Sequence, residues 1–267
     1  MGRFSKLELG SDESPRPNET GPAGEALSPL AREDEQYDPP SLLRRGLDRL
    51  FDGDPREALR LFGKALQGDS TLLEAWIGQI DALLALDQIR EADVWTTRAL
   101  GAFPDDPTLL SLRGVLMARQ GMLKRAIGTS DFALSKGQSL RSWIARGEIL
   151  LTADNANAAA CLDKAAEQIH AGDWMNLARV GTTWMRHRRW AQAHDVLLRA
   201  AAAEPRRAQL WRHLAECQMR LGFTEQAMNS QRRVLELVPG DRRAEAALHR
   251  LAKTGPLTRL WRRIWRR

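Results

Sequence analysis

Long apolar runs are absent from this sequence of 267 residues. No stretch is apolar over the roughly 20 residues that a membrane-spanning helix needs. The first residues, MGRFSKLELGSDESP, contain no apolar core of the kind that marks a secretory signal peptide. Only two cysteines occur, Cys161 and Cys217, and they form no CxxC pair. These absences argue against a membrane-spanning or exported protein and favour a reduced, cytoplasmic one.

The motifs of common enzymes and metal sites are missing as well. No glycine-rich phosphate loop, GxSxG or HExxH segment appears. The sequence has five histidines, at His170, His187, His194, His213 and His249. None has a cysteine or carboxylate partner at the usual metal-ligand spacing, and no serine or threonine is tied into a nucleophile–base unit. We therefore predict no catalytic residue, no metal site and no cofactor, and hence a protein that is not an enzyme.

Charge is distributed unevenly along the chain, which has a formal net charge of +6. Residues 1–40 carry four basic and nine acidic side chains and show no apolar periodicity. Such a composition cannot bury enough surface to offset chain entropy, so we predict a disordered, acidic N-terminal arm. Residues 254–267 carry five arginines and no acidic residue. The net charge thus combines an acidic beginning with a basic end.

Small residues recur with a period of 34 between these two ends. One series is Ala58, Ala92, Ala126, Ala159, Ala193 and Ala227, in which a single interval is 33. Two further series keep step with it: Gly46, Ile80, Gly114, Gly147, Gly181 and Ala215, and also Ala65, Ala99, Ala133, Ala166, Ala200 and Val234. Paired helices approach closely only where side chains are small. The period therefore predicts stacked pairs of helices rather than one globular core.

Helix signals agree with this interpretation. Asp54-Pro55 and Asp106-Pro107 each combine an N-cap residue with a proline suited to the first helical position. Gly121, Gly222 and Gly240 stand where helices are expected to end. Strand-like alternation is nowhere sustained. Each unit is thus predicted to be a first helix, a short turn, a second helix and another short turn.

A family resemblance emerges when the large residues are added. Four positions before each member of the glycine-rich series stand Leu42, Trp76, Leu110, Trp143, Leu177 and Trp211. Prolines close three units, at Pro104, Pro205 and Pro239. This combined pattern resembles the tetratricopeptide repeat, and it covers the chain from about Pro39 to Asp241. Asp241–Lys253 is similar to the capping helix of such arrays.

The sequence departs from the family pattern in two ways. The aromatic residue usual in the second helix is present as Phe62, whereas the other units have Thr96, Ser130, Asp163, Leu197 and Gln231 at the aligned positions. The fourth unit also lacks one residue and its closing proline. We expect a local distortion there within an unchanged fold.

The resemblance implies an all-α fold, a right-handed superhelical α-solenoid of about six helix-turn-helix repeats at residues 41–240, with a capping helix at 241–253. It also implies a non-catalytic scaffold or adaptor that binds a partner peptide or helix in a concave groove. The groove-facing positions that it implies are Leu43, Leu47, Ile77, Asp81, Ser111, Val115, Ile144, Glu148, Ala178, Thr182, Arg212 and Glu216.

The apolar members of this groove set permit two interpretations. If they are exposed, they indicate an amphipathic helix or hydrophobic peptide as the ligand. The alternative is that the twist of the superhelix buries them. One subfamily captures a C-terminal carboxylate with lysines and asparagines, but the first repeat contains no Lys-xxx-Asn, and such a receptor is disfavoured.

The C-terminal segment 254–267 is a predicted basic amphipathic helix. Its apolar face would consist of Leu257, Leu260, Trp261, Ile264 and Trp265, and its basic face of Arg259, Arg262, Arg263, Arg266 and Arg267. Such a helix fits an anionic membrane surface, where five arginines contribute on the order of 5 kcal/mol. The alternatives are that it caps its own solenoid, or that it docks on a partner or on nucleic acid. A nucleic-acid-binding protein using the basic body and tail is the alternative function, and a basic composition alone supports it only weakly.

Overall fold

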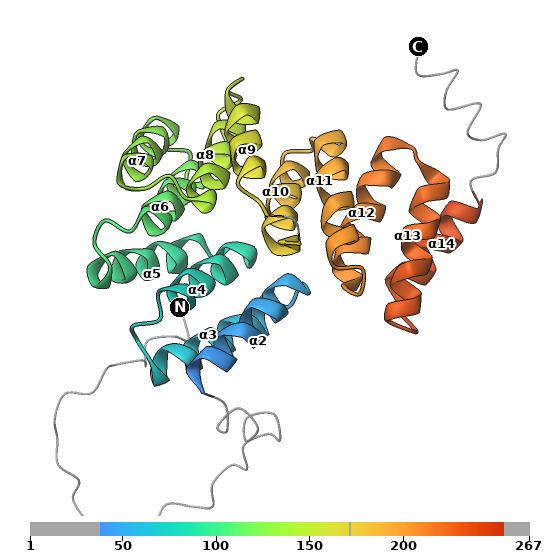
Figure 1. The fold of residues 1–267 in the computed structure, drawn as a ribbon, viewed down its shortest axis with the longest axis horizontal. Helices are drawn as coiled ribbons and strands as arrows, with labels where there is room; N and C mark the ends of the chain where they lie inside the picture. Colours follow the sequence, from blue (N-terminus) through green and yellow to red (C-terminus); the bar gives the residue numbers. More distant parts are fainter. Residues whose placement is uncertain (1–37, 171, 254–267) are drawn as a thin grey trace, which may run out of the picture. The chain divides into compact units, whose positions relative to one another are not determined.

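The computed structural model describes residues 38–170 and 172–253. By contacts the chain divides into two units, of which the second begins at Asp38. All described residues belong to this second unit. They form thirteen α-helices and no strand, and Figure 1 shows how these helices are arranged.

The helices follow one another as six pairs and a final single helix. The pairs are α2 (Pro39–Phe51) with α3 (Pro55–Gly68), α4 (Leu73–Ala85) with α5 (Ile89–Ala102), α6 (Pro107–Arg119) with α7 (Leu123–Lys136), α8 (Leu140–Thr152) with α9 (Ala158–Glu167), α10 (Trp174–Arg186) with α11 (Trp190–Ala203), and α12 (Ala208–Leu221) with α13 (Thr224–Leu237). The last helix, α14 (Arg242–Lys253), packs on α13.

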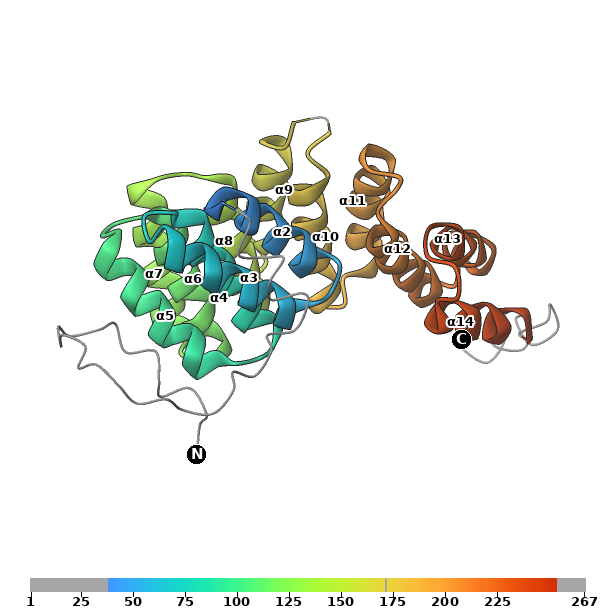
Figure 2. The same cartoon turned by 90° about the horizontal axis from the view of Figure 1, so that it is seen from below.

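Each helix packs on its successor, and the first helices of the pairs also pack on one another in order, from α2 through α4, α6, α8 and α10 to α12. We call these six the A helices and their partners the B helices. The stack of helical hairpins is visible in two perpendicular views (Figures 1 and 2). The predicted all-α solenoid of six helix-turn-helix repeats with a capping helix is confirmed.

The turns between the A and B helices of the repeats share one backbone conformation. A residue with positive φ ends each A helix, and these residues are Gly53, Asp87, Gly121, Asp154, Arg188 and Gly222. The amide of the next residue then donates to a carbonyl five positions back, as Gln88 N does to Leu83 O at 2.9 Å. Three repeats use glycine here, whereas the others accept the cost of a side chain in the left-handed region.

The predicted caps are also present. Asp54 accepts a hydrogen bond from the amide of Glu57 at 3.2 Å, and Asp106 accepts from the amides of Thr108 and Leu109 at 3.0 and 2.9 Å. These bonds satisfy donors that the first turn of a helix leaves without partners.

Close approach explains the small residues of the A helices. A Cβ added to Gly147 would lie 2.5 Å from Cγ of Leu162, and one added to Gly46 would lie 2.6 Å from Cε1 of Phe62. Both neighbours are B-helix residues of the same repeat and are buried. The glycine therefore makes room for a large side chain of the partner helix.

The fourth repeat requires a correction. The predicted small residue of its B helix, Ala159, is exposed, and the buried alanine is Ala158. Likewise Leu162, not Asp163, fills the position that Phe62 takes in the first repeat. Helix α9 has only 10 residues and begins at Ala158, and its buried side chains lie one position earlier than the repeat period predicts. The expected local distortion is thus a shift of register by one residue.

Several predicted segments fall outside the described residues. These are residues 1–37 of the acidic arm and the whole basic tail 254–267. The last residues of the predicted arm behave differently from expectation, because Pro39 and Pro40 already belong to α2, where proline suits the first helical turn. None of the helices in the described part combines the length and hydrophobicity that crossing a membrane requires.

Candidate functional site

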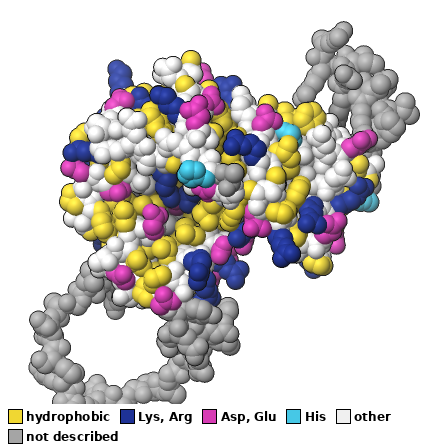
Figure 3. Space-filling model, in the orientation of Figure 1, with side chains coloured by type: hydrophobic (Ala, Val, Ile, Leu, Met, Phe, Trp, Pro, Cys, Tyr) yellow, Lys and Arg dark blue, Asp and Glu magenta, His cyan; other side chains and the backbone are white. Residues whose placement is uncertain are grey.

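A cavity of about 540 Å³ lies between the A helices. Its walls come from α2, α4, α6, α8 and α10, and His213 of α12 completes them. Hydrophobic, basic and acidic side chains lie side by side on the face of the molecule shown in Figure 3. Side chains from each of five successive repeats line this cavity. The cavity is therefore formed by the array and not by any single repeat.

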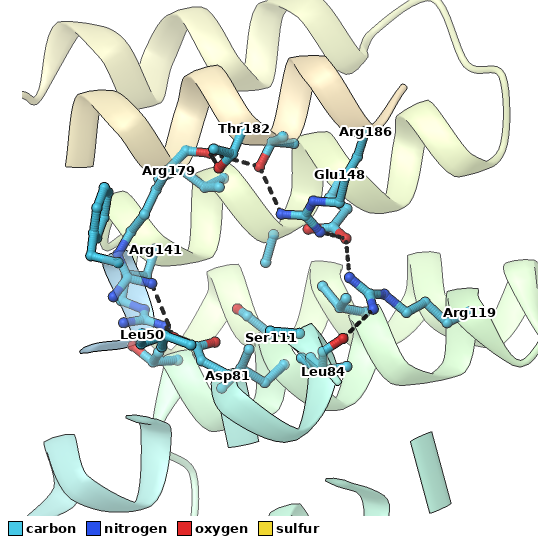
Figure 4. A pocket seen from close by; sticks show the side chains of 18 of the residues that line it. Leu50, Asp81, Leu84, Ser111, Arg119, Arg141, Glu148, Arg179, Thr182 and Arg186 are labelled. Carbon is cyan, nitrogen blue, oxygen red and sulfur yellow. Dashed lines mark hydrogen bonds and ion pairs between the residues drawn. The ribbon is translucent and has the colours of Figure 1, made fainter. Parts of the chain in front are cut away.

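Asp81 of α4 forms the first of two charged clusters in the cavity. Its Oδ2 accepts from Arg141 Nη2 of α8 at 2.5 Å and from Arg179 Nη1 of α10 at 3.0 Å. Burial alone would raise the pKa of Asp81, but the two guanidinium groups outweigh it and hold the pKa below its ordinary value. Burial and the charge of Arg141 together lower the pKa of Arg179. The carboxylate is therefore the shared counter-ion of two mutually repelling cations (Figure 4).

Glu148 of α8 forms the second cluster. Its Oε1 accepts from Arg186 Nη1 of α10 and from Arg119 Nη2 of α6, the latter at 3.2 Å. Arg119 also donates through Nη1 to the carbonyl of Leu84 at 3.0 Å, and Arg186 through Nη2 to Thr183 Oγ1 at 3.4 Å. These contacts fix both guanidinium groups so that they face the cavity (Figure 4).

The cavity has more basic than acidic side chains. Four arginines line it, against the two inward carboxylates of Asp81 and Glu148 and the exposed Asp87 at a turn. An arginine side chain has five N–H donors, and each of the four uses only part of them in the contacts above. The arrangement can therefore bind further anionic oxygens, and carboxylates in particular.

His213 adds a neutral polar group to the wall. Its Nε2 lies 2.8 Å from Nε2 of Gln209, so the imidazole accepts that amide donor when it is uncharged. Burial, and then the charge of Arg212, lower the pKa of His213 to about 4. The imidazole is consequently uncharged at neutral pH.

A second set of contacts joins the first repeat to the fifth and sixth, and we call it the clasp. It consists of Asp48, Phe51, Asp52, Trp174 and Arg207. Arg207 donates to Asp48 at 2.8 Å and to Asp52 at 3.2 Å, and its guanidinium lies 4.6 Å from the ring centroid of Trp174. Phe51 meets the same indole edge to face at 4.7 Å. The C-terminal end of α2 is thereby bound to the N-terminal ends of α10 and α12.

The predicted groove residues divide between the cavity and other places. Seven of the twelve line the cavity: Leu47, Asp81, Ser111, Val115, Ile144, Glu148 and Thr182. The other five do not, namely Leu43, Ile77, Ala178, Arg212 and Glu216.

Burial explains most of the second group. Ile77 and Ala178 are fully buried in the core, and Leu43 is half-buried against it. Arg212 is bound to Asp241 at 2.6 Å, and Glu216 is half-exposed beside Arg220. Of the three apolar members that line the cavity, Val115 and Ile144 are less than 9% exposed and Leu47 is partly exposed. The burial alternative thus describes Val115 and Ile144, whereas the cavity wall also contains the partly exposed Leu47 together with charged side chains.

The four cavity arginines were not among the predicted site residues. Arg179 directly follows Ala178 in the sequence and Arg141 precedes Ile144 by three positions. A repeat-based alignment assigns Ile144 and Ala178 to the groove. The longer side chains of the nearby Arg141 and Arg179 reach the cavity. The signal that could have found these residues is the excess of arginine over acidic residues within the predicted A helices of repeats three to five.

A metal centre is not indicated by the described residues, since they contain no group of three or more His, Cys, Asp or Glu side chains that could hold an ion. The sulfur atoms of Cys161 and Cys217 are free and buried.

Comparison with known proteins finds a family model that matches part of the chain. The family model described as Tetratricopeptide repeat matches residues 50–127, from the end of α2 into α7. No curated protein matches the chain at a significant level. Solved structures similar to it include a chain of the APC/C hetero-tetramer Cut9–Hcn1, with 16% identity and a TM-score of 0.49 over 83% of this chain and 44% of that one. This chain therefore spans less than half the length of that relative.

Two smaller structures are similar over nearly their whole length. PilW, a type IV pilus biogenesis factor, shows 16% identity and a TM-score of 0.48 over 79% of this chain and 98% of that one. YrrB, a TPR protein with an unusual peptide-binding site, shows 18% identity and a TM-score of 0.41 over 73% and 98%.

The fold and the shared cavity define a helical-repeat protein in which successive hairpins build one common surface. The family match covers residues 50–127, and six helical hairpins follow one another over residues 39–237. The resemblance to the tetratricopeptide repeat noted in the sequence is confirmed over residues 50–127.

Proposed function

We propose that this protein is a non-catalytic scaffold whose A-helix cavity binds an acidic segment of a partner protein. The observation that carries the proposal is the pair of arginine clusters around Asp81 and Glu148, which present four guanidinium groups from three helices to one cavity. The partner peptide or helix expected from the family resemblance thus acquires a chemical character, namely carboxylate side chains.

Charge supports an acidic ligand over the hydrophobic peptide considered from the sequence. Four of the six apolar groove positions are buried and offer little surface to a ligand, whereas Leu43 and Leu47 are partly exposed. Guanidinium groups bind carboxylates through short, paired hydrogen bonds that are stronger than neutral ones. The largely buried carboxylates of Asp81 and Glu148 hold these guanidinium groups in place, where a lower local dielectric strengthens such bonds.

Thr182 offers a direct test. It lines the cavity next to both clusters, and its hydroxyl group bonds only to the carbonyl of Arg179 in its own helix, at 3.0 Å. Thr182→Glu adds a carboxylate that would compete for the arginines, and Thr182→Gln adds nearly the same volume without charge. We expect affinity capture followed by mass spectrometry to lose specific partners with Thr182→Glu and to keep them with Thr182→Gln.

Each other outcome of this experiment is decisive. Equal partner sets for the wild type and both variants would show that the cavity is not the binding site. Loss with both variants would indicate a sterically demanding but not acidic ligand. If nucleic acid were captured in place of protein partners, and if its binding in a gel-shift assay weakened steeply with salt, the alternative function would be favoured.

The basic tail extends the proposal to an anionic membrane surface. Residues 254–267 combine five arginines with an apolar face in their predicted helix. A scaffold with such a tail would be peripheral to a membrane, on the cytoplasmic side as the sequence predicts. This part rests on the sequence pattern alone, and its test is given in the Discussion.

A further inference from the structure

The clasp and the cavity share one helix end. Leu47, Leu50 and Phe51 of α2 line the cavity, and Phe51 also packs on Trp174 in the clasp. The residues that join the first repeat to the fifth and sixth are therefore continuous with one wall of the cavity. Any movement of α2 away from α10 would remove that wall.

The ion pairs of the clasp are contacts that salt can weaken. The side chains of Asp48 and Asp52 are 45% and 44% exposed, and that of Arg207 is 21% exposed. Exposed ion pairs are individually weak and are screened by salt. Helix α2 otherwise packs on α3 and α4, its neighbours along the array. Losing the clasp therefore leaves every repeat on its neighbours and requires no repeat to unfold.

A repeat array is suited to such a movement. Each repeat contacts mainly the next one, so small rotations between repeats add up along the array. The Asp81 bridge ties α4 to α8 and α10 independently of the clasp. Movement of the first repeat alone can thus change access to the cavity while the charged clusters stay intact.

We propose that the clasp is a reversible gate, closed in this structure, whose opening separates α2 from Trp174 and Arg207 and admits the partner segment to the cavity. The inference regulates the site of the proposed function and rests on it for the identity of the occupant. Closing and binding then compete, so the population of the open form scales the apparent affinity for the partner.

Opening is measurable without any partner. Asp48→Asn with Asp52→Asn removes both carboxylates of the clasp, and Asp163→Asn with Glu167→Gln removes two exposed carboxylates on α9 as a matched control. Spin labels are placed on Arg44→Cys in α2 and Gln192→Cys in α11, both at exposed positions. Double electron–electron resonance then measures the distance between the two labels. We expect one narrow distribution for the wild type and the control, and a longer, broader one for the clasp variant. High salt should shift the wild type in the same direction.

Chemical access to the cavity provides a second measurement that does not depend on the labels. A thiol at Thr182→Cys lies in the cavity wall. The native cysteines are buried, and burial raises the pKa of both, to about 12 for Cys217, so they remain in place as slowly reacting references. We expect a thiol reagent to modify Thr182→Cys at least about tenfold faster in the clasp variant than in the control, with unchanged circular dichroism.

Identical distances and identical modification rates in the clasp variant and the control would overturn the gate. This failure is distinct from failure of the proposed function. Partner loss with Thr182→Glu but no opening would leave the scaffold and remove the gate. Opening together with unchanged partner capture by Thr182→Glu would leave a conformational device and remove the acidic ligand.

Discussion

The carboxylate of Asp81 and the guanidinium of Arg179 lie 3.0 Å apart, although 98 positions separate them in the chain. Asp81 also accepts from Arg141, so one side chain connects repeats two, four and five. Breaking such a buried pair leaves charges without a partner, which costs far more than an exposed ion pair contributes.

Replacing Asp81 should therefore destabilise the whole array. For Asp81→Ala we expect the free energy of unfolding to fall by about 3 kcal/mol, because Arg141 and Arg179 would lose their common counter-ion. The exposed Asp163→Ala should change it by less than about 0.5 kcal/mol. Urea unfolding followed by circular dichroism checks both. An equal effect of the two variants would show that the Asp81 bridge contributes no net stability.

The turn at Arg188 offers a stabilising substitution. Arg188 is the one long side chain among the positive-φ residues that end the A helices, with φ of 59°. A left-handed conformation costs a non-glycine residue about 1–2 kcal/mol, and part of this gain is lost to the greater freedom of glycine in the unfolded chain. We expect Arg188→Gly to stabilise the protein by about 0.5–1 kcal/mol in thermal unfolding, with Arg188→Ala near neutral.

Two glycines in helices should respond to alanine in opposite ways. At Gly147 a Cβ would meet Leu162 at 2.5 Å, whereas at Gly63 nothing lies within 4 Å. Gly147→Ala should therefore destabilise by about 1–3 kcal/mol through overpacking, and Gly63→Ala should stabilise by up to about 1 kcal/mol through helix propensity. If Gly147→Ala proved as stable as the wild type, close packing of α8 on α9 would not explain the glycine.

His213 predicts a pH dependence of stability. Its pKa is about 4 in the folded protein and near 6.5 in the unfolded chain. The unfolded chain therefore binds the proton first, so this contribution is fully present above about pH 6.5 and is lost as the pH falls toward 4. We expect a loss of about 2 kcal/mol at pH 5. His213→Gln should flatten the profile between these pH values, and an unchanged profile would assign the dependence to other groups.

The tail prediction concerns residues beyond the described part. Residues 254–267 carry five arginines and the residues of a predicted apolar face. The full chain should therefore float with anionic liposomes and not with neutral ones. Truncation after Lys253 should abolish flotation, and replacement of Trp261 and Trp265 by alanine should reduce it. Equal flotation of the full and truncated chains would remove the membrane from the proposal.

The repeat period predicted most of the fold because small residues at fixed intervals have one cause, the contact between paired helices. The period was wrong by one residue in the fourth repeat, where it predicted Ala159 and the buried alanine is Ala158. The run Ala156–Ala160, interrupted by one asparagine, offers several small residues in succession. Only the packing of Leu162 against Gly147 decides among them, and a contact between two helices is not visible in the spacing of either.

The charged cavity could not be predicted in the same way. Asp81 and Glu148 were assigned to the groove from their repeat positions, and both line the cavity. Their arginine partners come from other repeats, and Arg207 of the clasp lies 159 positions from Asp48. Such pairs depend on the summed curvature of several repeats, which a repeating pattern does not specify.

The contact between Arg207 and α2 also constrains the number of hairpins in the array. Most arrays of this kind are open-ended, so a hairpin can be added or deleted without disturbing distant ones. Here a hairpin inserted or removed between α2 and α10 would displace Trp174 and Arg207 from α2, and Asp48 and Phe51 would lose their counterparts. The clasp therefore fixes the number of hairpins between these two helices.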